Sequence, residues 1–497
     1  MKMKKISKSY YKIWFTILAI MITIGVLFIK PQVGIADQGD FNRIMTVSGL
    51  SLLDSDTSNP NFIRFYDYIV TDYKISHIDN VSTTIVGSSL GHLIVLIAYI
   101  CKVFGQTVFK TQYLAIVYST IYILALSIIL KSLNIKDKVK FILVSLLTLF
   151  IFFDGNYLVW FNSLYGEPMM LVTLLLFIAS ILNYIHYKYV INGTKKIMLR
   201  IVYILLTAFF FLGSKLQVFT SLPFVILIVG KIIWDNKHTL NKISIISLCT
   251  LLCLVIAYPI GINMNSDSLS LSKDTQYNSV FYGVLNGSKT PEQDLIDLGL
   301  NPDMAIEAGK HTYLSTSEYV KYVPSAEITD QEFYSKISNA KLAKFYLTHP
   351  TRLLKGMEYT ASKAFYTSTS LGKNYQSYSE IPVSEFYRFT GWSYFRENML
   401  PKNLFFIISI YVIVFLFSLY KYVKNKSNSE IKTKILLLWT IMLIGAIQFP
   451  MPFVGNGQAD TSKQLFLFNF IFDGLLVIIF SYILFKIADF IRHELRK

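Results

Sequence analysis

Charged residues are scarce in this chain of 497 residues, because Asp, Glu, Lys and Arg make up only 16% of it. Soluble domains usually carry roughly 25% charged residues. In addition, 53% of the residues are hydrophobic, and several apolar runs reach the roughly 18 residues expected of a membrane-spanning helix. This composition excludes an ordinary soluble protein and predicts an all-α polytopic membrane protein.

Cysteine and histidine are also rare, with three and seven residues respectively. Cys101, Cys249 and Cys253 all lie in apolar segments, so the polar regions contain neither a disulfide framework nor a thiolate metal site. The histidines show no His-x-x-x-His spacing, and the chain has no P-loop and no Gly-x-Ser-x-Gly turn. No motif therefore indicates a zinc enzyme, a nucleotide hydrolase or a serine hydrolase.

The formal net charge of +16 does not indicate a nucleic-acid partner. Lys and Arg are concentrated in short segments between apolar runs, which is the pattern of basic cytoplasmic loops in membrane proteins. A nucleic-acid-binding protein would carry a contiguous basic face on a soluble domain, and the sequence shows no such face. The positive charge is therefore evidence about topology.

The apolar segments define the candidate membrane helices. The first one follows a basic N-terminus and could be a signal peptide cleaved near Gly34-Ile35-Ala36, but its length favours a retained anchor. The candidates are 13–30, 85–104, 112–130, 138–154, 168–187, 199–213, 216–233, 243–262, 403–422, 434–450 and 465–488.

The basic segments between these helices decide which of them cross the membrane. If 85–104 crossed, every later basic loop would lie outside. If 85–104 is instead an interfacial or re-entrant helix on the outer side, all the basic segments become cytoplasmic, as the orientation rule prefers. We therefore predict about ten crossings, with both termini in the cytoplasm. The basic segments are 131–140, 188–200, 231–242, 421–434 and 492–497.

This topology divides the chain into three parts. Residues 1–262 form an N-terminal transmembrane module with an acidic first outer loop at 31–111, and residues 403–497 form the C-terminal transmembrane helices. Residues 263–402 are too many for a connector, and we predict a mostly helical extracytoplasmic domain there. Within it, apolar spacing predicts a helix over 330–347 that ends at His349-Pro350.

Seven ionisable residues outside the apolar runs are placed by this topology near the outer membrane boundary. Ionisable groups at such depth are unfavourable and tend to mark functional sites. Each also has a structural interpretation: a solvated loop, a helix start that favours an acid, a snorkelling lysine or a surface ion pair. The candidates are Asp37, Asp40, Arg43, Glu167, Lys215, Asp460 and Lys463.

An acid beside cations at a membrane surface suits one type of chemistry. The acid can deprotonate an acceptor hydroxyl, and Lys or Arg can hold a phosphate. Together they favour transfer of a group from a lipid phosphate carrier, with the lipid tail among the helices and the outer domain over the acceptor.

These features resemble the GT-C superfamily of membrane glycosyltransferases. The shared order is an N-terminal anchor, an outer loop with an aspartate, a membrane-surface helix (GHLIVLIAYICKVFG) and a span that ends in a basic loop. More specifically, the chain resembles WsfD-like bacterial S-layer and cell-wall glycan hexosyltransferases. The shared stretches are GIADQGDFNR, YGEP, GSKLQ, VFYGVLNGSKTPEQDLIDLGL and GNGQADTSKQLFLFN.

The resemblance implies an activity and a set of roles. It implies transfer of a hexose from a polyprenyl-phosphate carrier to a cell-surface glycan or lipid-linked acceptor, at the outer face of a bacterial plasma membrane. Asp40 becomes the candidate general base and Asp37 the second candidate. Arg43, Lys215 and Lys463 become phosphate ligands, and Glu167, Asp460 and His92 candidate substrate ligands. A divalent cation, Mg²⁺ or Mn²⁺, is optional in this superfamily, and oxygen ligands from Asp37, Asp40 and Glu167 could hold one.

Other functions remain open at this stage. A flippase or transporter of lipid-linked glycans would also need cations facing a phosphate, although we detect no internal repeat and no unusual charges at the midplane. A glycan polymerase or ligase would also act outside on lipid-linked substrates. Such enzymes typically rely on Arg and His in their outer loops, whereas the outer candidate residues of this chain are led by acids. A non-enzymatic assembly subunit is a further alternative.

Overall fold

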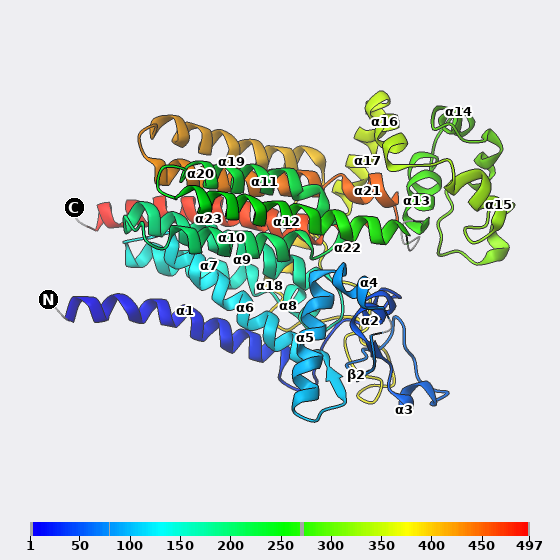
Figure 1. Cartoon of the computed structure of the whole chain (residues 1–497), viewed down its shortest axis with the longest axis horizontal. Helices are drawn as coiled ribbons and strands as arrows, with labels where there is room; N and C mark the ends of the chain where they lie inside the picture. Colours follow the sequence, from blue (N-terminus) through cyan, green and yellow to red (C-terminus); the bar gives the residue numbers. More distant parts are fainter. Residues whose placement is uncertain (1–2, 79, 269–272, 496–497) are drawn as a thin grey trace.

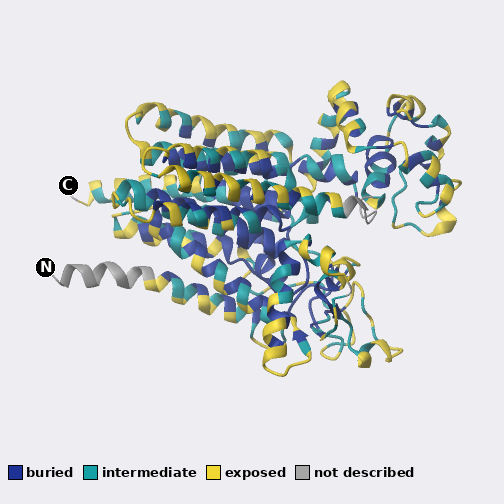
Figure 2. Ribbon diagram, viewed as in Figure 1, coloured by how far each residue is buried: buried dark blue, intermediate teal, exposed yellow. Residues whose placement is uncertain are grey.

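The computed structural model describes residues 3–78, 80–268 and 273–495. Long helices lie side by side in one bundle, and smaller elements gather at one end of it (Figure 1). Buried residues are concentrated inside the bundle, whereas its lateral faces expose many apolar side chains, as expected of surfaces that face lipid (Figure 2). The bundle helices are α1 (Met3–Leu27), α6 (Thr111–Ser132), α7 (Lys138–Phe152), α9 (Glu167–Ile185), α10 (Ile197–Leu212), α11 (Leu222–Trp234), α12 (Lys242–Ser268), α19 (Leu404–Lys424), α20 (Ser429–Gln448) and α23 (Phe466–Glu494).

In the described part of the chain, seven helices are long and apolar enough to cross a membrane. An eighth span is possible if α7 and the segment Gly155–Phe161, bent by 54° at a short break, count as one. The apolar parts of α1 (Ile13–Leu27) and α10 are shorter than a usual span, yet both helices run along the bundle (Figure 1). The predicted all-α polytopic fold is confirmed, whereas the count of ten crossings stays a prediction that requires α1 and α10 to cross.

The basic connecting segments gather at the end of the bundle where α1 begins and α23 ends. Lys140 bonds Asp489 of α23 at 2.7 Å, and Arg492 binds Asp137 through its second nitrogen at 2.9 Å. On another side, Lys188 bonds the side chain of Asn236 at 2.8 Å. The structure thus joins segment 131–140 to the end of α23 and segment 188–200 to segment 231–242, all at the same end of the bundle (Figure 1), as the charge pattern predicts. Which side of a membrane this end faces remains a prediction.

Segment 85–104 forms α5 (Ser89–Val103), which runs across the far end of the bundle and not along it (Figure 1). The Ser88 side chain caps this helix by accepting a hydrogen bond from the Gly91 N–H at 3.3 Å. The Ser89 N–H and hydroxyl bond the carbonyls of Gly213 and Phe210, at 2.8 and 2.9 Å. This orientation agrees with the prediction that the segment lies at the surface.

The first outer loop folds beside α5 into a small unit that the sequence did not predict. It contains α2 (Phe41–Ser48), two short helices, α3 (Asp54–Thr57) and α4 (Val81–Ile85), and an antiparallel sheet in the order β1-β2-β3. Tyr73 pairs with Phe109, and both rings are buried. The strands are β1 (Leu50–Ser51), β2 (Asp72–Ile75) and β3 (Val108–Lys110).

The predicted extracytoplasmic domain, residues 263–402, has two parts. Residues 273–348 enclose a separate apolar core in an outer lobe, which α17 (Pro350–Ser362) connects to the rest. Residues 363–402 return to the bundle and pack against the first outer loop and α23 through α18 (Gly391–Met399). The lobe helices are α13 (Lys273–Ser279), α14 (Pro291–Asp297), α15 (Glu327–Thr329) and α16 (Asn339–Thr348).

The single helix predicted over 330–347 is wrong. A π-helical turn covers Asp330–Tyr334, and α16 begins after Ser338, whose hydroxyl accepts a hydrogen bond from the Lys341 N–H at 3.3 Å. The cap starts a new helix because a serine oxygen satisfies a free N–H there. The apolar residues of the pattern are nevertheless all buried, and the predicted break at His349-Pro350 is confirmed.

Candidate functional site

Asp37 ends an extended, buried segment that leaves α1. Its Oδ1 accepts hydrogen bonds from the N–H groups of Gly39 at 2.7 Å and Phe41 at 3.1 Å. Gly39 has a φ of +111°, which favours glycine. Asp37 is only 2% exposed, and burial raises its pKa despite the two N–H donors. Asp37 therefore shapes the turn that precedes α2.

Asp40 stands at the end of this turn, directly before α2. Its carboxylate forms an ion pair with Lys463 of α22 (Thr461–Gln464), and its side chain is 46% exposed. Burial opposes ionisation of this carboxyl, but the charges of Lys463 and Lys215 outweigh it and hold the pKa below its ordinary value. Asp40 is therefore ionised and open to an incoming molecule.

Lys463 is the more enclosed member of this pair, with a side chain 12% exposed. Its ammonium lies 4.8 Å from the centre of the Tyr165 ring, at cation–π distance. Burial opposes the charge, yet the carboxylates of Asp40 and Glu167 outweigh it and raise the Lys463 pKa. The lysine is thus a fixed positive charge at this end of the bundle.

A second ion pair lies within electrostatic reach of Asp40. Glu167, the first residue of α9, is fully buried, and its Oε1 accepts a hydrogen bond from Lys215 at 2.5 Å. Lys215 occupies the short turn after α10. Oε2 of Glu167 has no hydrogen-bond partner among the described residues. The two ion pairs bring four of the predicted residues together from four distant parts of the chain.

Tyr165 joins these parts, and the sequence analysis did not single it out. Its hydroxyl donates to the Ala36 carbonyl at 2.9 Å and accepts from the Gln38 N–H at 3.0 Å. Its ring meets Phe41 edge to face, with the ring centres 4.7 Å apart. Tyr165 therefore ties the turn at Asp37 to the start of α9. Tyr165 belongs to the motif Tyr-Gly-Glu-Pro, in which only the glutamate, Glu167, is a predicted site residue.

Arg64 is a second residue that the sequence analysis missed. Its guanidinium lies 3.6 Å from Asp37 Oδ2, bonds the side chain of Asn42 and stands 4.7 Å from the Phe65 ring centre. Nothing in its local sequence indicates this role, because Asp37 is distant along the chain. Arg64 adds a cation on the open side of α2.

The remaining predicted residues have different surroundings. Arg43 is exposed on α2 and contributes to the lowered pKa of Asp40. Asp460 is exposed, has a φ of +50°, and accepts a hydrogen bond from Gln38 Nε2 at 3.2 Å. The hydrogen bonds of His92 go to Thr84, Ile85 and Tyr258, and none reaches the ion pairs. His92 packs α5 against α12, and its substrate-binding role stays a prediction.

The outer lobe is fastened directly to the loop that carries Lys463. Asn278 donates to the Asn456 side chain at 2.9 Å, and the Gln458 N–H donates to the Tyr282 carbonyl at 3.2 Å. A Cβ on Gly283 would lie only 3.0 Å from the Gly457 Cα, so the two backbones need glycine to approach. This contact fixes the lobe beside the ion pairs.

The lobe also brings Tyr313 toward the site. Partial burial raises the pKa of Tyr313, which keeps 60% of its surface exposed, and the carboxylates of Asp460, Asp274 and Asp40 raise it further.

The residues proposed for a divalent cation do not fit one. Across residues 3–78, 80–268 and 273–495, no three His, Cys, Asp or Glu side chains are grouped to hold a metal ion. Asp40 and Glu167 are each paired with a lysine, and Asp37 Oδ1 is occupied by N–H donors. The optional Mg²⁺ or Mn²⁺ of the resemblance is thus untested, and it has no matching donor set among the described residues.

A model of the family described as YfdI N-terminal transmembrane domain matches residues 1–497, the whole chain. No curated protein and no solved structure matches.

Proposed function

This chain belongs to the YfdI N-terminal transmembrane domain family, and we propose that it is a membrane glycosyltransferase similar to the GT-C superfamily. It transfers a sugar, a hexose in the WsfD-like interpretation, from a polyprenyl-phosphate carrier to a cell-surface glycan or lipid-linked acceptor. The observation that carries the proposal is the ionised, half-exposed Asp40 paired with Lys463 beside the Lys215–Glu167 pair. A family of transmembrane domains is compatible with a lipid carrier.

The reaction is a direct displacement. Asp40 accepts the proton of the acceptor hydroxyl while the acceptor oxygen bonds the anomeric carbon. The bond from that carbon to the phosphate oxygen breaks, and its electron pair leaves with the polyprenyl phosphate. Lys463 and Lys215 hold the phosphate charge, and the sugar inverts at the anomeric carbon.

Lys463 links donor binding to the state of the base. In the empty site it neutralises Asp40 and makes it a weak base. An arriving phosphate competes for the lysine, and a carboxylate released from its partner is a stronger base. Asp40 thus gains basicity when the donor is in place.

The test of the proposal is a transfer assay with the full chain. Membranes that contain the protein are incubated with labelled polyprenyl-phosphate sugars, one hexose at a time, and label leaving the lipid is measured. We expect one sugar to be released from its carrier into a glycan or lipid-linked product. If the label remains on the lipid but crosses the bilayer, the protein is a flippase or transporter. If preassembled glycan chains are joined instead, it is a polymerase or ligase.

Replacing Lys463 by Met tests the role of the ion pair through the pH dependence of transfer. Transfer requires ionised Asp40. Lys463 lowers the Asp40 pKa before the donor binds, so the acid limb of the wild-type kcat/KM profile, which reports the donor-free protein, lies at low pH. Without the lysine the pKa rises, and the acid limb moves to higher pH. The maximal rate should fall by about 100-fold, as for loss of one charge-stabilising donor.

The matched control is Lys363→Met. Lys363 is exposed, and its backbone carbonyl accepts a hydrogen bond from Ser462, one residue before Lys463. We expect its pH profile to be unchanged. An acid limb that stays in place in Lys463→Met would contradict the proposed coupling of Lys463 to the base.

A further inference from the structure

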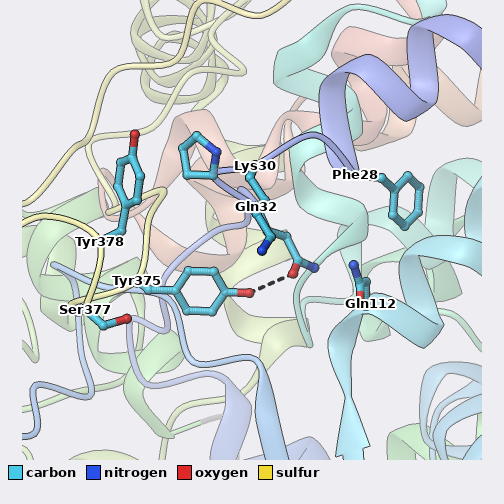
Figure 3. Close-up of a pocket in the computed structure, with 8 residues that line it drawn as sticks. Phe28, Lys30, Gln32, Gln112, Tyr375, Ser377 and Tyr378 are labelled. Carbon is cyan, nitrogen blue, oxygen red and sulfur yellow. Dashed lines mark hydrogen bonds between the residues drawn. The ribbon is translucent and has the colours of Figure 1, made fainter.

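A cavity of about 370 Å³ opens near the outer end of α1, outside the cluster of ion pairs (Figure 3). Three parts of the chain line it: the segment that follows α1, with Lys30 and Gln32, the start of α6 with Gln112, and the returning segment with Tyr375 and Tyr378. None of these residues belongs to the proposed transfer machinery. The cavity lies within the volume range of small-molecule sites in proteins.

A side-chain hydrogen bond joins two of the segments that line the cavity. The carboxamide oxygen of Gln32 accepts a hydrogen bond from the Tyr375 hydroxyl at 2.8 Å, which fixes the amide (Figure 3). Its Nε2 is buried and has no partner among the described residues. The Gln112 side chain lies close by (Figure 3).

The chemistry of the lining indicates a neutral, oxygen-rich ligand. Tyr375, Tyr378 and Phe28 supply aromatic surface, and the two glutamines and Ser377 supply amide and hydroxyl groups. Lys30 is the only charged residue among those that line the cavity, and it is exposed. A phosphate site would need several cations or a nest of N–H donors. Rings beside neutral donors and acceptors suit a saccharide.

The cavity is connected to the turn at Asp37 by one pair of extended segments. Gln32 faces Tyr375, the Gly34 N–H bonds the Lys373 carbonyl at 3.1 Å, and the Ala36 N–H bonds the Gly372 carbonyl at 3.0 Å. The two segments therefore run antiparallel from the cavity toward Asp37. At the rise of an extended strand, the five residue-to-residue steps from Gln32 to Asp37 span about 16 Å.

The close contacts along this pair make the connection rigid. A Cβ on Gly372 would lie 1.7 Å from the Asp67 carbonyl oxygen, and one on Gly34 would lie 2.5 Å from the Asn162 carbonyl oxygen. Val33, Ile35 and Ala36 between the two ends are buried. The cavity and the turn at Asp37 are thus held at a set separation.

We propose that the cavity lined by Gln32, Gln112, Tyr375 and Tyr378 is a neutral-saccharide site that binds a sugar unit of the acceptor glycan. The assignment to the acceptor rests on the proposed function, whereas saccharide binding itself does not. When one sugar unit of a glycan occupies this cavity, the growing end of the glycan, several units away, reaches Asp40. The site thereby favours acceptors above a minimal length.

In the test, the full chain is purified in detergent, and saturation-transfer NMR measures the binding of methyl glycosides. The glycosides are those of glucose, galactose, mannose, rhamnose and N-acetylglucosamine. We expect at least one glycoside to bind, and Tyr378→Ala and Gln112→Ala each to weaken its binding about tenfold, as loss of one good contact does. Both positions are at least partly exposed, so the variants keep the fold. Lys30→Ala is the matched control on the rim and should bind like wild type.

Three results would overturn the site: no glycoside binds, binding is unchanged in both cavity variants, or inorganic phosphate displaces the glycoside and Lys30→Ala abolishes binding.

Asp40→Asn separates the two proposals, because it should stop transfer and leave glycoside binding intact. In the transfer assay, Gln112→Ala should raise KM for the acceptor and leave KM for the lipid donor unchanged. Glycoside binding without any sugar transfer would refute the glycosyltransferase and retain the saccharide site.

Discussion

Replacing Asp40 by Asn is expected to lower the rate of sugar transfer by about 10²- to 10⁴-fold, the contribution of a positioned general base. The substitution keeps the size of the side chain and removes its ability to accept the proton of the acceptor hydroxyl. Lys463 loses its ionic partner, but the phosphate of the donor supplies another charge. Binding of the lipid-linked donor should therefore change little. Two quantities are measured for each variant: the single-turnover rate of sugar transfer and the affinity for the lipid-linked donor.

Two matched variants decide whether this loss is specific. Asp460→Asn changes a nearby exposed carboxylate that contacts Gln38, and it should retain most of the activity. Asp37→Asn keeps an oxygen that can accept from Gly39 and Phe41, so the turn survives and transfer should persist. If Asp37→Asn is inactive while Asp40→Asn transfers sugar at the wild-type rate, then Asp37 is the base and Asp40 is not.

The arrangement of the bundle could be predicted because charge and hydropathy act locally. The basic segments lie at one end, and the helix over 85–104 crosses the other end instead of joining the bundle. All seven predicted boundary residues then fell within electrostatic reach of at least one other member of the set. The predicted topology was therefore enough to identify much of the candidate site, because it placed loops that are distant in sequence at the same end of the bundle.

The contacts that shape the site could not be predicted in the same way. Tyr165 meets Ala36, Arg64 meets Asp37, and Gly283 meets Gly457, all across long stretches of sequence. No periodicity relates such residues, because their spacing depends on how the loops pack. The sheet of the first loop was missed for a related reason: strands of two to four residues leave too little alternation to detect.

A fully buried ion pair, Arg396 with Asp473, could not be predicted from the sequence either. Arg396 lies on a short helix of the outer region and Asp473 lies within α23. Their side chains are both 0% exposed, 2.6 Å apart. The Trp392 indole N–H donates to the same carboxylate oxygen at 2.8 Å, and the Arg396 Nε donates to the Phe365 carbonyl at 2.9 Å. This network joins the outer region to α23, the helix that begins three residues after Lys463.

Replacing Arg396 by Met is expected to lower the stability of the protein by about 3–5 kcal/mol, because a buried carboxylate loses its cation. The measurement is the midpoint of thermal unfolding in detergent, together with the half-life at one fixed temperature. Arg388→Met is the matched control. That arginine bonds the backbone carbonyls of Val26, Ile29 and Pro31, and no carboxylate of the described residues pairs with it, so its loss should have a much smaller effect.

A second substitution in the same pair distinguishes a charge effect from a packing effect. Arg396→Met combined with Asp473→Leu removes both charges, and an apolar pair of similar volume often restores the stability of a buried ion pair. We therefore expect the double variant to unfold well above Arg396→Met. If the single variant unfolds like wild type, Asp473 is neutral and the pair is not ionic. If the double variant is as unstable as the single one, the outer region is held by the geometry of the hydrogen bonds and not by the charges.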